Sequence, residues 1–534
     1  MIQSIDYAAV APSLILALTA GLVLLLDAFL PRTRALPATV TFAAVLASLV
    51  AVALQAAAGR TLSTFCVPPD RRHAAPACSY VVDHLTLIFA AVVLTAALVI
   101  VLLSATQLTL PGAIPVGEWY FLLLCTLAGA VTLPASRDLI TLVVALELVS
   151  LPAFALAALK RYDAKGSEAA LKLFLVSVVS TAVMLFGVSL LYGLTGSVHL
   201  VRIAERLTGP QAATGEGPAV PVGVLAVAVV LVIAGFAFKV AAVPFHFWAA
   251  DVYRGAPLPV AALLSVISKA AGFAGLILLL TTALAGQSAF WTPVVAVLSA
   301  VTMTTGNLLA LRQRDPVRLL AWSSVAQSGY ILAPLGVQTQ NAAGAATAYL
   351  AIYAAMNLGA FAVVMLVPPP GLDDRRDLDH YRGLASRGPA AALSLAFFLA
   401  CLAGLPPGLA GLFAKIVVFR EIVDGGGAWL AVVMAVNTVI GLYYYLAWMA
   451  RLFIPTPTTP PPGHPATPPA GAAAVPSSEA AGGAVTSAVT GTSGAAITAG
   501  RLAGARPAAI AVAITLALTI AFSVAPQLIL SAVG

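Results

Sequence analysis

The stretch LLSVISKAAGFAGLILLL, residues 263–280, places one lysine in the middle of an otherwise apolar run. The run covers roughly 258–284, and about 20 apolar residues are enough to cross a bilayer as a helix. An ionisable group at that depth costs roughly 2.5–3.5 kcal/mol. Lys269 lies too far from either end of the run to extend its stem to water. We therefore expect this lysine to have a function, most simply in moving protons.

The rest of the chain has the same character. Of its 534 residues, 61% are hydrophobic and 9% are charged, whereas soluble domains carry about 25% charged residues. The sequence predicts an all-α, polytopic membrane protein of about 14 transmembrane helices. The apolar runs fall near 8–30, 36–58, 84–104, 118–133, 139–159, 169–194, 220–248, 258–284, 289–311, 317–336, 342–367, 389–419, 428–453 and 507–532.

The basic residues of the loops predict the orientation of the chain. If the N-terminus lies outside, sixteen Lys and Arg residues fall in cytoplasmic loops and seven fall outside. Short loops that stay in the cytoplasm are enriched in these residues. We therefore expect a multi-pass membrane protein with both termini outside. The net charge of +7 follows from this bias and does not indicate nucleic-acid binding, because the basic residues are scattered.

The other lysines within apolar runs are Lys172, Lys239 and Lys415, and Glu147 lies in the middle of another such run. It is expected to bind a proton, although a hydroxyl such as that of Ser150 could also satisfy a protonated carboxyl. Lys172 follows Glu168 by four residues, a spacing that favours an ion pair on one helix. Lys172 could therefore either extend to the membrane surface or take part in proton transfer.

Lys239 and Lys415 each lie near a proline that interrupts an apolar run, in FKVAAVPFHFW (238–248) and AGLPPGLAGLFAK (403–415). Broken helices at membrane depth are typical of transporters built from inverted repeats. The two lysines could pair with the carbonyl groups freed at the breaks, or they could relay protons where water enters. His246 lies beside the first break and is a candidate gate or relay.

Polar residues recur at helical spacing on two other runs. They are Ser323, Gln327 and Tyr330 on one and Tyr349, Tyr353 and Asn357 on the other. Such stripes can hold helices together or hold water between the lysines. Asp315 and Pro316 predict an N-cap and the first residue of a helix.

The loops offer little chemistry. Cys66 and Cys78 share the loop between the second and third runs, where a disulfide is one of two open possibilities. Residues 455–505 are rich in Pro, Ala, Gly, Ser and Thr and predict a flexible cytoplasmic linker. The chain has no nucleotide-binding glycine motif and no Cys/His cluster, so we expect it to hold neither a cofactor nor a metal.

With these residues in view, the chain resembles the antiporter-like membrane subunits of respiratory complex I, and most closely their subunit N branch. The lysines at 269 and 415 favour this branch, since relatives tend to have histidine at the first position and subunit M has glutamate at the second. The resemblance covers most of residues 140–450. It is carried by ALELVSLPAFALAAL (145–159), EAALKLFLVSVVSTAVMLFG (168–187), FKVAAVPFHFWAADVYRGAPLPV (238–260), ISKAAGF (267–273), TGNLLALRQRDPVRLLAWSSVAQSGY (305–330), YAAMNLGAF (353–361), LAGLPPGLAGLFAK (402–415) and VNTVIGLYYYL (436–446).

The resemblance implies fourteen helices with two inverted five-helix repeats. The domains expected on this basis are helices one to four (1–135), a first repeat region (136–285), a second repeat (286–454), the linker (455–505) and a last helix (506–534). The resemblance also implies a proton relay made of Glu147, Lys172, Lys239, Lys269 and Lys415.

The family implies partners as well. They are other membrane subunits of the complex and the lipid bilayer, with FMN, iron–sulfur clusters and quinone on partner subunits. Two other functions stay open. The chain could belong to a multisubunit sodium/proton antiporter or a membrane-bound hydrogenase, or it could hold a pump together without conducting protons.

Overall fold

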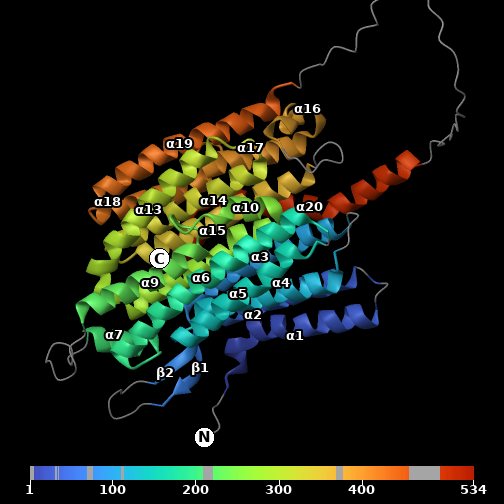
Figure 1. The fold of residues 1–534 in the computed structure, drawn as a ribbon. Coiled ribbons are helices and arrows are strands. Elements are labelled where there is room, and N and C mark those ends of the chain that lie inside the picture. The colour runs from blue at the N-terminus through green and yellow to red at the C-terminus, as the bar shows by residue number, and fades with distance from the viewer. Residues whose placement is uncertain are drawn as a thin grey trace, which may run out of the picture.

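The computed structural model describes residues 5–30, 33, 35–68, 76–109, 114–160, 162–208, 221–367, 377–455 and 493–533. Within these ranges the chain forms a bundle of long helices, with α1 and α2 at one edge and α18 and α19 at the other (Figure 1). Twelve helical segments of the described part are long and apolar enough to cross a membrane. The prediction of a polytopic, all-helical membrane protein is confirmed.

The elements of the first half end at the first helix break. They are α1 (Tyr7–Phe29), α2 (Leu36–Ala57), β1 (Leu62–Val67), β2 (Ala77–Val82), α3 (His84–Thr109), α4 (Val116–Thr132), η1 (Leu133–Ala135), α5 (Leu139–Ala158), α6 (Ala164–Thr195), α7 (Leu200–Thr208) and α9 (Val222–Lys239).

The second half begins after that break. Its elements are α10 (Trp248–Gly255), α11 (Leu258–Leu263), η2 (Leu264–Ser268), α12 (Lys269–Leu278), η3 (Leu279–Ala283), η4 (Ala285–Gln287), α13 (Ser288–Ala310), α14 (Pro316–Leu332), η5 (Ala333–Gly336), α15 (Ala342–Leu366), η6 (Leu378–Tyr381), α16 (Leu384–Arg387), α17 (Pro389–Ala403), α18 (Leu409–Asp424), α19 (Ala428–Phe453), α20 (Ser493–Val524) and α21 (Gln527–Val533).

Each predicted apolar run corresponds to helix in the structure. The runs at 317–336 and 389–419 correspond to α14 with η5 and to α17 with α18, and these are not among the twelve spanning segments. The count of fourteen helices therefore stays a prediction. The central helices are α14, α15 and the segment from α11 to η3, whose side chains are almost all buried.

A short β-hairpin lies where the sequence analysis expected only a loop. Strands β1 and β2 pair antiparallel, with Cys66 opposite Cys78, and these two cysteines form a disulfide. The hairpin packs on α1 through Leu62, Tyr80 and Ala9. It lies at the same end of the bundle as α7 (Figure 1). Residues along β1 alternate between buried and exposed, but Thr64 is buried and Phe65 is exposed, so the hydropathy of the sequence did not indicate this strand.

Both predicted helix breaks are present. The first separates α9 from α10, and the second separates α17 from α18. Backbone groups freed at the first break find side-chain partners, because the Trp248 indole donates to the Phe238 carbonyl and the Thr302 hydroxyl accepts from the Val243 amide. Unpaired backbone groups are costly away from water. The breaks are therefore stabilised by neighbouring helices rather than by solvent.

The C-terminal helix α20 supplies a hydrogen-bond partner at the second break. It packs between α3 and α15, and the Ser523 hydroxyl accepts a hydrogen bond from the Ala410 amide at 3.1 Å. Residues 456–492 of the predicted linker lie outside the described residues. From Ser493 onward the structure is helical, which differs from the linker expected up to 505. Several alanines and few prolines explain the helix over this stretch.

Helix starts follow the expected chemistry. Asp315 accepts hydrogen bonds from the Val317 and Arg318 amides, and Pro316 is the first residue of α14. The predicted cap is confirmed. Asp138 caps α5 in the same way. These caps satisfy amides that a helix leaves unpaired at its N-terminus.

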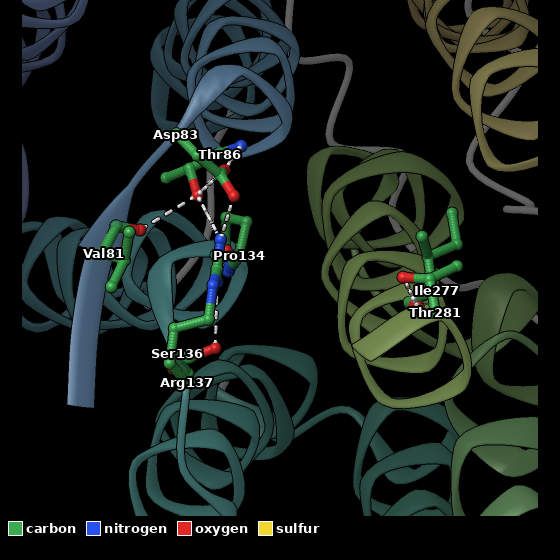
Figure 2. A network of polar contacts seen from close by, with 8 residues as sticks. All are labelled: Val81, Asp83, Thr86, Pro134, Ser136, Arg137, Ile277 and Thr281. Carbon is green, nitrogen blue, oxygen red and sulfur yellow. Dashed lines mark hydrogen bonds and ion pairs between the residues drawn. The ribbon is translucent and has the colours of Figure 1, made fainter. Parts of the chain in front are cut away.

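An ion pair between a buried arginine and a partly exposed aspartate ties the hairpin end of α3 to the turn between α4 and α5 (Figure 2). The Arg137 guanidinium lies 2.5 Å from the Asp83 carboxylate and also donates to the Pro134 and Ser136 carbonyls. Burial raises the pKa of Asp83, but the charge of Arg137 and hydrogen bonds from Thr86 and Arg137 outweigh it. The pKa of this carboxyl is left below its usual value.

We predict that Asp83→Asn lowers the thermal stability of the protein at neutral pH by about 1 kcal/mol, near the upper end for a partly exposed pair. A carboxyl with a lowered pKa stabilises the fold above its unfolded pKa and loses this contribution as the pH falls through the folded value. The difference from the wild type should therefore shrink on acidification, as thermal unfolding at several pH values would show. Asp424→Asn, at an exposed pair with Arg420, serves as the control and should have little effect at any pH.

Candidate functional site

The polar stretch WSSVAQSGY, residues 322–330, forms the middle of α14 and passes through the centre of the bundle. Its predicted polar residues Ser323, Gln327 and Tyr330 are all buried. Ser324 and Ser328, which the sequence analysis did not single out, are buried on the same helix. Hydrogen bonds connect α14 to Lys269 and to the backbone next to Lys239, and the Tyr330 ring of α14 lies beneath the Lys415 amine.

Glu147 of α5 and Lys239 at the end of α9 form the first part of the site. The Lys239 Nζ lies 3.7 Å from Glu147 Oε1. The Thr181 hydroxyl of α6 donates to the same carboxylate oxygen at 2.7 Å. Ser150 does not satisfy Glu147, as one interpretation of the sequence had it, because its hydroxyl contacts the Lys239 amine instead. The structure thus forms a carboxylate–ammonium pair at membrane depth.

The surroundings of Lys239 are almost closed. Its amine donates to the Ser177 hydroxyl at 3.2 Å and lies 5.4 Å from the centre of the Phe238 ring. A cavity of about 10 Å³ lies beside it, lined in part by Ser150, Ser268 and Trp248, and a volume of this size holds about one water molecule. Lys239 therefore combines one charged partner with room for limited hydration.

Lys269 lies at the junction of the π-helix η2 with α12 and is fully buried. Its amine donates to the Ser324 carbonyl at 2.5 Å and to the Ser328 hydroxyl at 2.8 Å. Within the described ranges, no ion pair of Lys269 with a carboxylate is recorded. Neutral oxygens stabilise an ammonium only in part, so this amine is held without a counter-charge.

A single serine connects the first two lysines. The Ser328 hydroxyl donates to the carbonyl of Val240, the residue that follows Lys239 at the helix break. The same hydroxyl accepts from the Lys269 amine. Gly272 of α12 lies against this backbone, and a side chain there would come within 3.1 Å of Lys239 Cβ. The break after α9 therefore places a freed carbonyl within hydrogen-bond reach of the serine that also accepts from Lys269.

Lys415 of α18 forms the far part of the site. Its amine donates to the Ala403 carbonyl at 2.6 Å and to the Leu402 carbonyl at 3.3 Å, both at the broken end of α17. It also lies 5.5 Å above the ring centre of Tyr330. The break thus supplies the oxygens that hold this lysine, as one interpretation of the sequence proposed.

The predicted polar stripes of α14 and α15 meet. Tyr353 donates to the Ser324 hydroxyl at 2.8 Å, and Asn357 donates to the Ser265 hydroxyl in η2 at 2.8 Å. Tyr349 donates to Gln327 Oε1 at 2.7 Å. These contacts fix the π-helical turn before Lys269 and connect both helices through side chains alone.

Two predicted residues lie apart from this group. Lys172 is 46% exposed and pairs with Glu168 at 2.7 Å and with Asp251 at 3.2 Å. The expected pair with Glu168 is confirmed. The ring of His246 packs against Phe247 and Trp322. No hydrogen bond from His246 to a relay lysine is recorded in the described part of the chain.

Several buried or half-buried partners were missed by sequence reasoning. They are Thr181, Asn307, Ser328, Asn437, Tyr444 and Tyr445. Tyr445 contacts both Ser323 and Gln327, and Asn437 bonds to Asn307. The spacing of Asn437 and Tyr444, seven residues apart on one helix, is a signal that could have found them.

A search for clusters of His, Cys, Asp and Glu finds no group of three that could hold a metal ion among the residues described.

Comparison with known proteins decides the family. A model described as NADH:quinone oxidoreductase/Mrp antiporter, TM, matches residues 136–441. NADH-quinone oxidoreductase subunit N 2 of Streptomyces griseus is 52% identical over 461 residues, which are 85% of this chain and 84% of that protein. This chain belongs to the subunit N family of NADH-quinone oxidoreductases. Subunit N of Salinispora tropica is 46% identical over 465 residues, covering 85% and 86% of the two chains.

Solved structures share the fold of this chain. A chain of respiratory complex I from Thermus thermophilus with bound aureothin is 28% identical and has a TM-score of 0.69, covering 98% of this chain and 99% of that one. A chain of the Mrp complex from Dietzia sp. DQ12-45-1b has a TM-score of 0.77 at 24% identity, covering 99% and 96%. The second likeness shows the fold alone.

The hydrogen bonds of Lys415 to the end of α17 require a close approach of α18 to α17. A Cβ at Gly411 would lie 1.7 Å from the Cys401 carbonyl oxygen. We predict that Gly411→Ala prevents this contact and lowers the amount of assembled protein in the membrane by about tenfold or more, since such a clash costs several kcal/mol. Gly193→Ala, where nothing lies within 4 Å, is the control. Native gels with immunodetection measure assembly, and normal levels of the Gly411 variant would contradict the geometry of the break.

Proposed function

We propose that this chain is the proton-translocating subunit N of a bacterial NADH:quinone oxidoreductase. The observation that carries the proposal is the state of Lys269, a fully buried amine held by a carbonyl and a hydroxyl with no carboxylate recorded beside it. Membership of the subunit N family supports the same activity.

The arrangement supports a relay in three steps. Separation of Glu147 from Lys239 removes the charge that stabilises the ammonium of Lys239. A proton that leaves Lys239 converts it to a free amine and is taken up by Lys269 by way of water or the Ser328 hydroxyl. Passage along α14 then brings the proton to Lys415. Lys172 pairs with carboxylates at an exposed position and adjusts the charge near the Glu147 end.

Energy for each step must come from partner subunits. Moving one charge against 100 mV costs about 2.3 kcal/mol. We propose that other membrane subunits of the complex, together with partner subunits that carry FMN, iron–sulfur clusters and quinone, supply it through a change of charge next to the Glu147–Lys239 pair.

We propose a location in the plasma membrane with both termini outside. The basic residues described near one end of the bundle support this orientation. Arg254 pairs with Asp315, and Arg318 pairs with Asp251. Arg387 lies in α16, at the end of the bundle opposite the hairpin and α7 (Figure 1). That end would face the cytoplasm, and the disulfide of the hairpin would face the oxidising side.

We predict that Lys269→Ala leaves the complex assembled and lowers proton pumping by about tenfold or more, which equals roughly 1.4 kcal/mol of lost coupling. The measurement is proton uptake by inverted membrane vesicles during NADH oxidation, with quinone reduction followed in parallel. The matched control is Lys160→Ala, because Lys160 lies outside the spanning helices and pairs only with Asp163 among the ion pairs of the described residues.

The same assay separates the competing functions. Normal pumping and quinone reduction in an assembled Lys269→Ala complex would favour a purely structural subunit. Pumping that requires sodium in the buffer would favour a sodium/proton antiporter. Purification from native membranes without flavin and iron–sulfur proteins would contradict the assignment to this oxidoreductase.

A further inference from the structure

A buried polar cluster next to the site has no part in the relay described above. It consists of Asn307 on α13 with Asn437 and Tyr444 on α19, and each of these residues is at most 4% exposed. The Asn307 amide nitrogen donates to Asn437 Oδ1 at 3.2 Å, and the Tyr444 hydroxyl donates to Asn307 Oδ1 at 3.0 Å. Asn437 in turn donates to the Thr304 hydroxyl and the Val433 carbonyl.

The cluster is directed at one phenol. The same Asn307 nitrogen donates to the Tyr330 hydroxyl at 3.3 Å. With this bond both donors of the Asn307 amide are used, and its oxygen is occupied by Tyr444. The amide of Asn307 therefore has a single orientation that satisfies all its partners, and that orientation presents a donor to Tyr330.

Tyr330 is held from two sides. Its ring stacks on that of Tyr349, with centres 6.1 Å apart and planes 10° apart, and its hydroxyl is held by Asn307. The Lys415 amine lies over the ring at 5.5 Å from the centre. The face of an aromatic ring is negative and attracts an ammonium within about 6 Å.

Lys415 depends on such a contact more than Lys239 does, because Lys239 pairs with a carboxylate. Lys239 has Glu147 at 3.7 Å, whereas the recorded partners of Lys415 in the described ranges are two backbone carbonyls and this ring. The ring face is thus the one contact of Lys415 that side-chain packing can move, because both carbonyls belong to the end of a helix.

We propose that the ring of Tyr330 is the seat of the protonated form of Lys415, and that Asn307, oriented by Asn437 and Tyr444, is the positioning residue for this ring. The proposal rests on the proposed function, in which Lys415 carries a proton. It adds a determinant of how long the proton stays there, since a ring that swings away leaves the ammonium with carbonyl partners only.

Asparagine pairs between membrane helices can also serve only to hold the helices together. The position of Gly441 argues for a more demanding role. A Cβ there would lie 3.3 Å from Asn307 Oδ1 and 3.7 Å from the Tyr444 hydroxyl. The absence of a side chain at Gly441 thus leaves room on α19 for the Asn307 amide oxygen next to the Tyr444 hydroxyl that donates to it. This arrangement fixes the orientation of the Asn307 amide.

The ring is tested by changing its charge distribution at constant shape. In the assembled complex, Tyr330→Phe is expected to keep about half or more of the pumping activity and Tyr330→Leu to lose about threefold to tenfold, because only the aromatic residue attracts a cation. Incorporation of mono-, di- and trifluorinated phenylalanine at position 330 should lower pumping stepwise, since fluorine withdraws charge from the ring face. Equal pumping across the fluorinated series would overturn the proposal.

The positioning role of Asn307 is tested in the same vesicles. Asn307→Leu is expected to lower pumping as far as Tyr330→Phe does, because both changes remove the bond between the Asn307 amide and the Tyr330 hydroxyl, and the double variant should fall no further. The control is Ser299→Ala, which removes a buried hydrogen bond between α13 and α14 to the Gly329 carbonyl and touches neither tyrosine. Additive losses, or normal pumping in Asn307→Leu, would overturn the role assigned to Asn307.

A final variant separates this inference from the proposed function. If Lys415→Ala pumps normally in the assembled complex, the proposed relay fails and the seat has no cation to hold. If Lys415→Ala loses pumping while the fluorinated series does not respond, only the seat at Tyr330 is wrong.

Discussion

Two amines at membrane depth are held by uncharged oxygens, and the surrounding helices supply those oxygens. Lys269 takes a carbonyl and a hydroxyl of α14, and Lys415 takes two carbonyls at the end of α17. A carbonyl stabilises an ammonium without cancelling its charge, so the charged and neutral amines differ less in free energy than they would next to carboxylate or in pure hydrocarbon. A group balanced in this way can gain and lose a proton within a working cycle.

The same requirement explains why the helices are irregular where the lysines lie. In an intact α-helix the carbonyl groups accept hydrogen bonds from amides of the same helix. The breaks after α9 and α17 release carbonyls, and the π-helical turn η2 precedes Lys269 directly. Several released groups have a partner from another helix, such as Ser328 for Val240 or Trp248 for Phe238. Irregular backbone is tolerated at this depth because it is packed in protein.

Helix α14 illustrates how far the sequence could be interpreted. Its stripe of Ser323, Gln327 and Tyr330 was visible from spacing, and the buried charges were visible from composition. The partners of those residues were not, because Tyr445 comes from a helix far along the chain and Asn307 from the helix before α14, and spacing does not tell which faces of two helices meet. Nor did spacing decide between alternatives for Lys172 or Glu147. Lys172 turned out exposed between two carboxylates, and Glu147 is bound by Thr181 rather than by Ser150.

Apolar runs, their interruptions and the rare charges within them were determined by the sequence alone, because the cost of burying an ionisable group in a bilayer acts on each residue in its own segment. The tertiary structure alone decided which oxygen faces which amine, that a hairpin closes the loop between α2 and α3, and that Tyr330 lies beneath Lys415. The reason is physical. Hydropathy is a property of a segment, whereas a hydrogen bond across the bundle depends on the relative rotation and depth of two helices, which only their mutual packing sets.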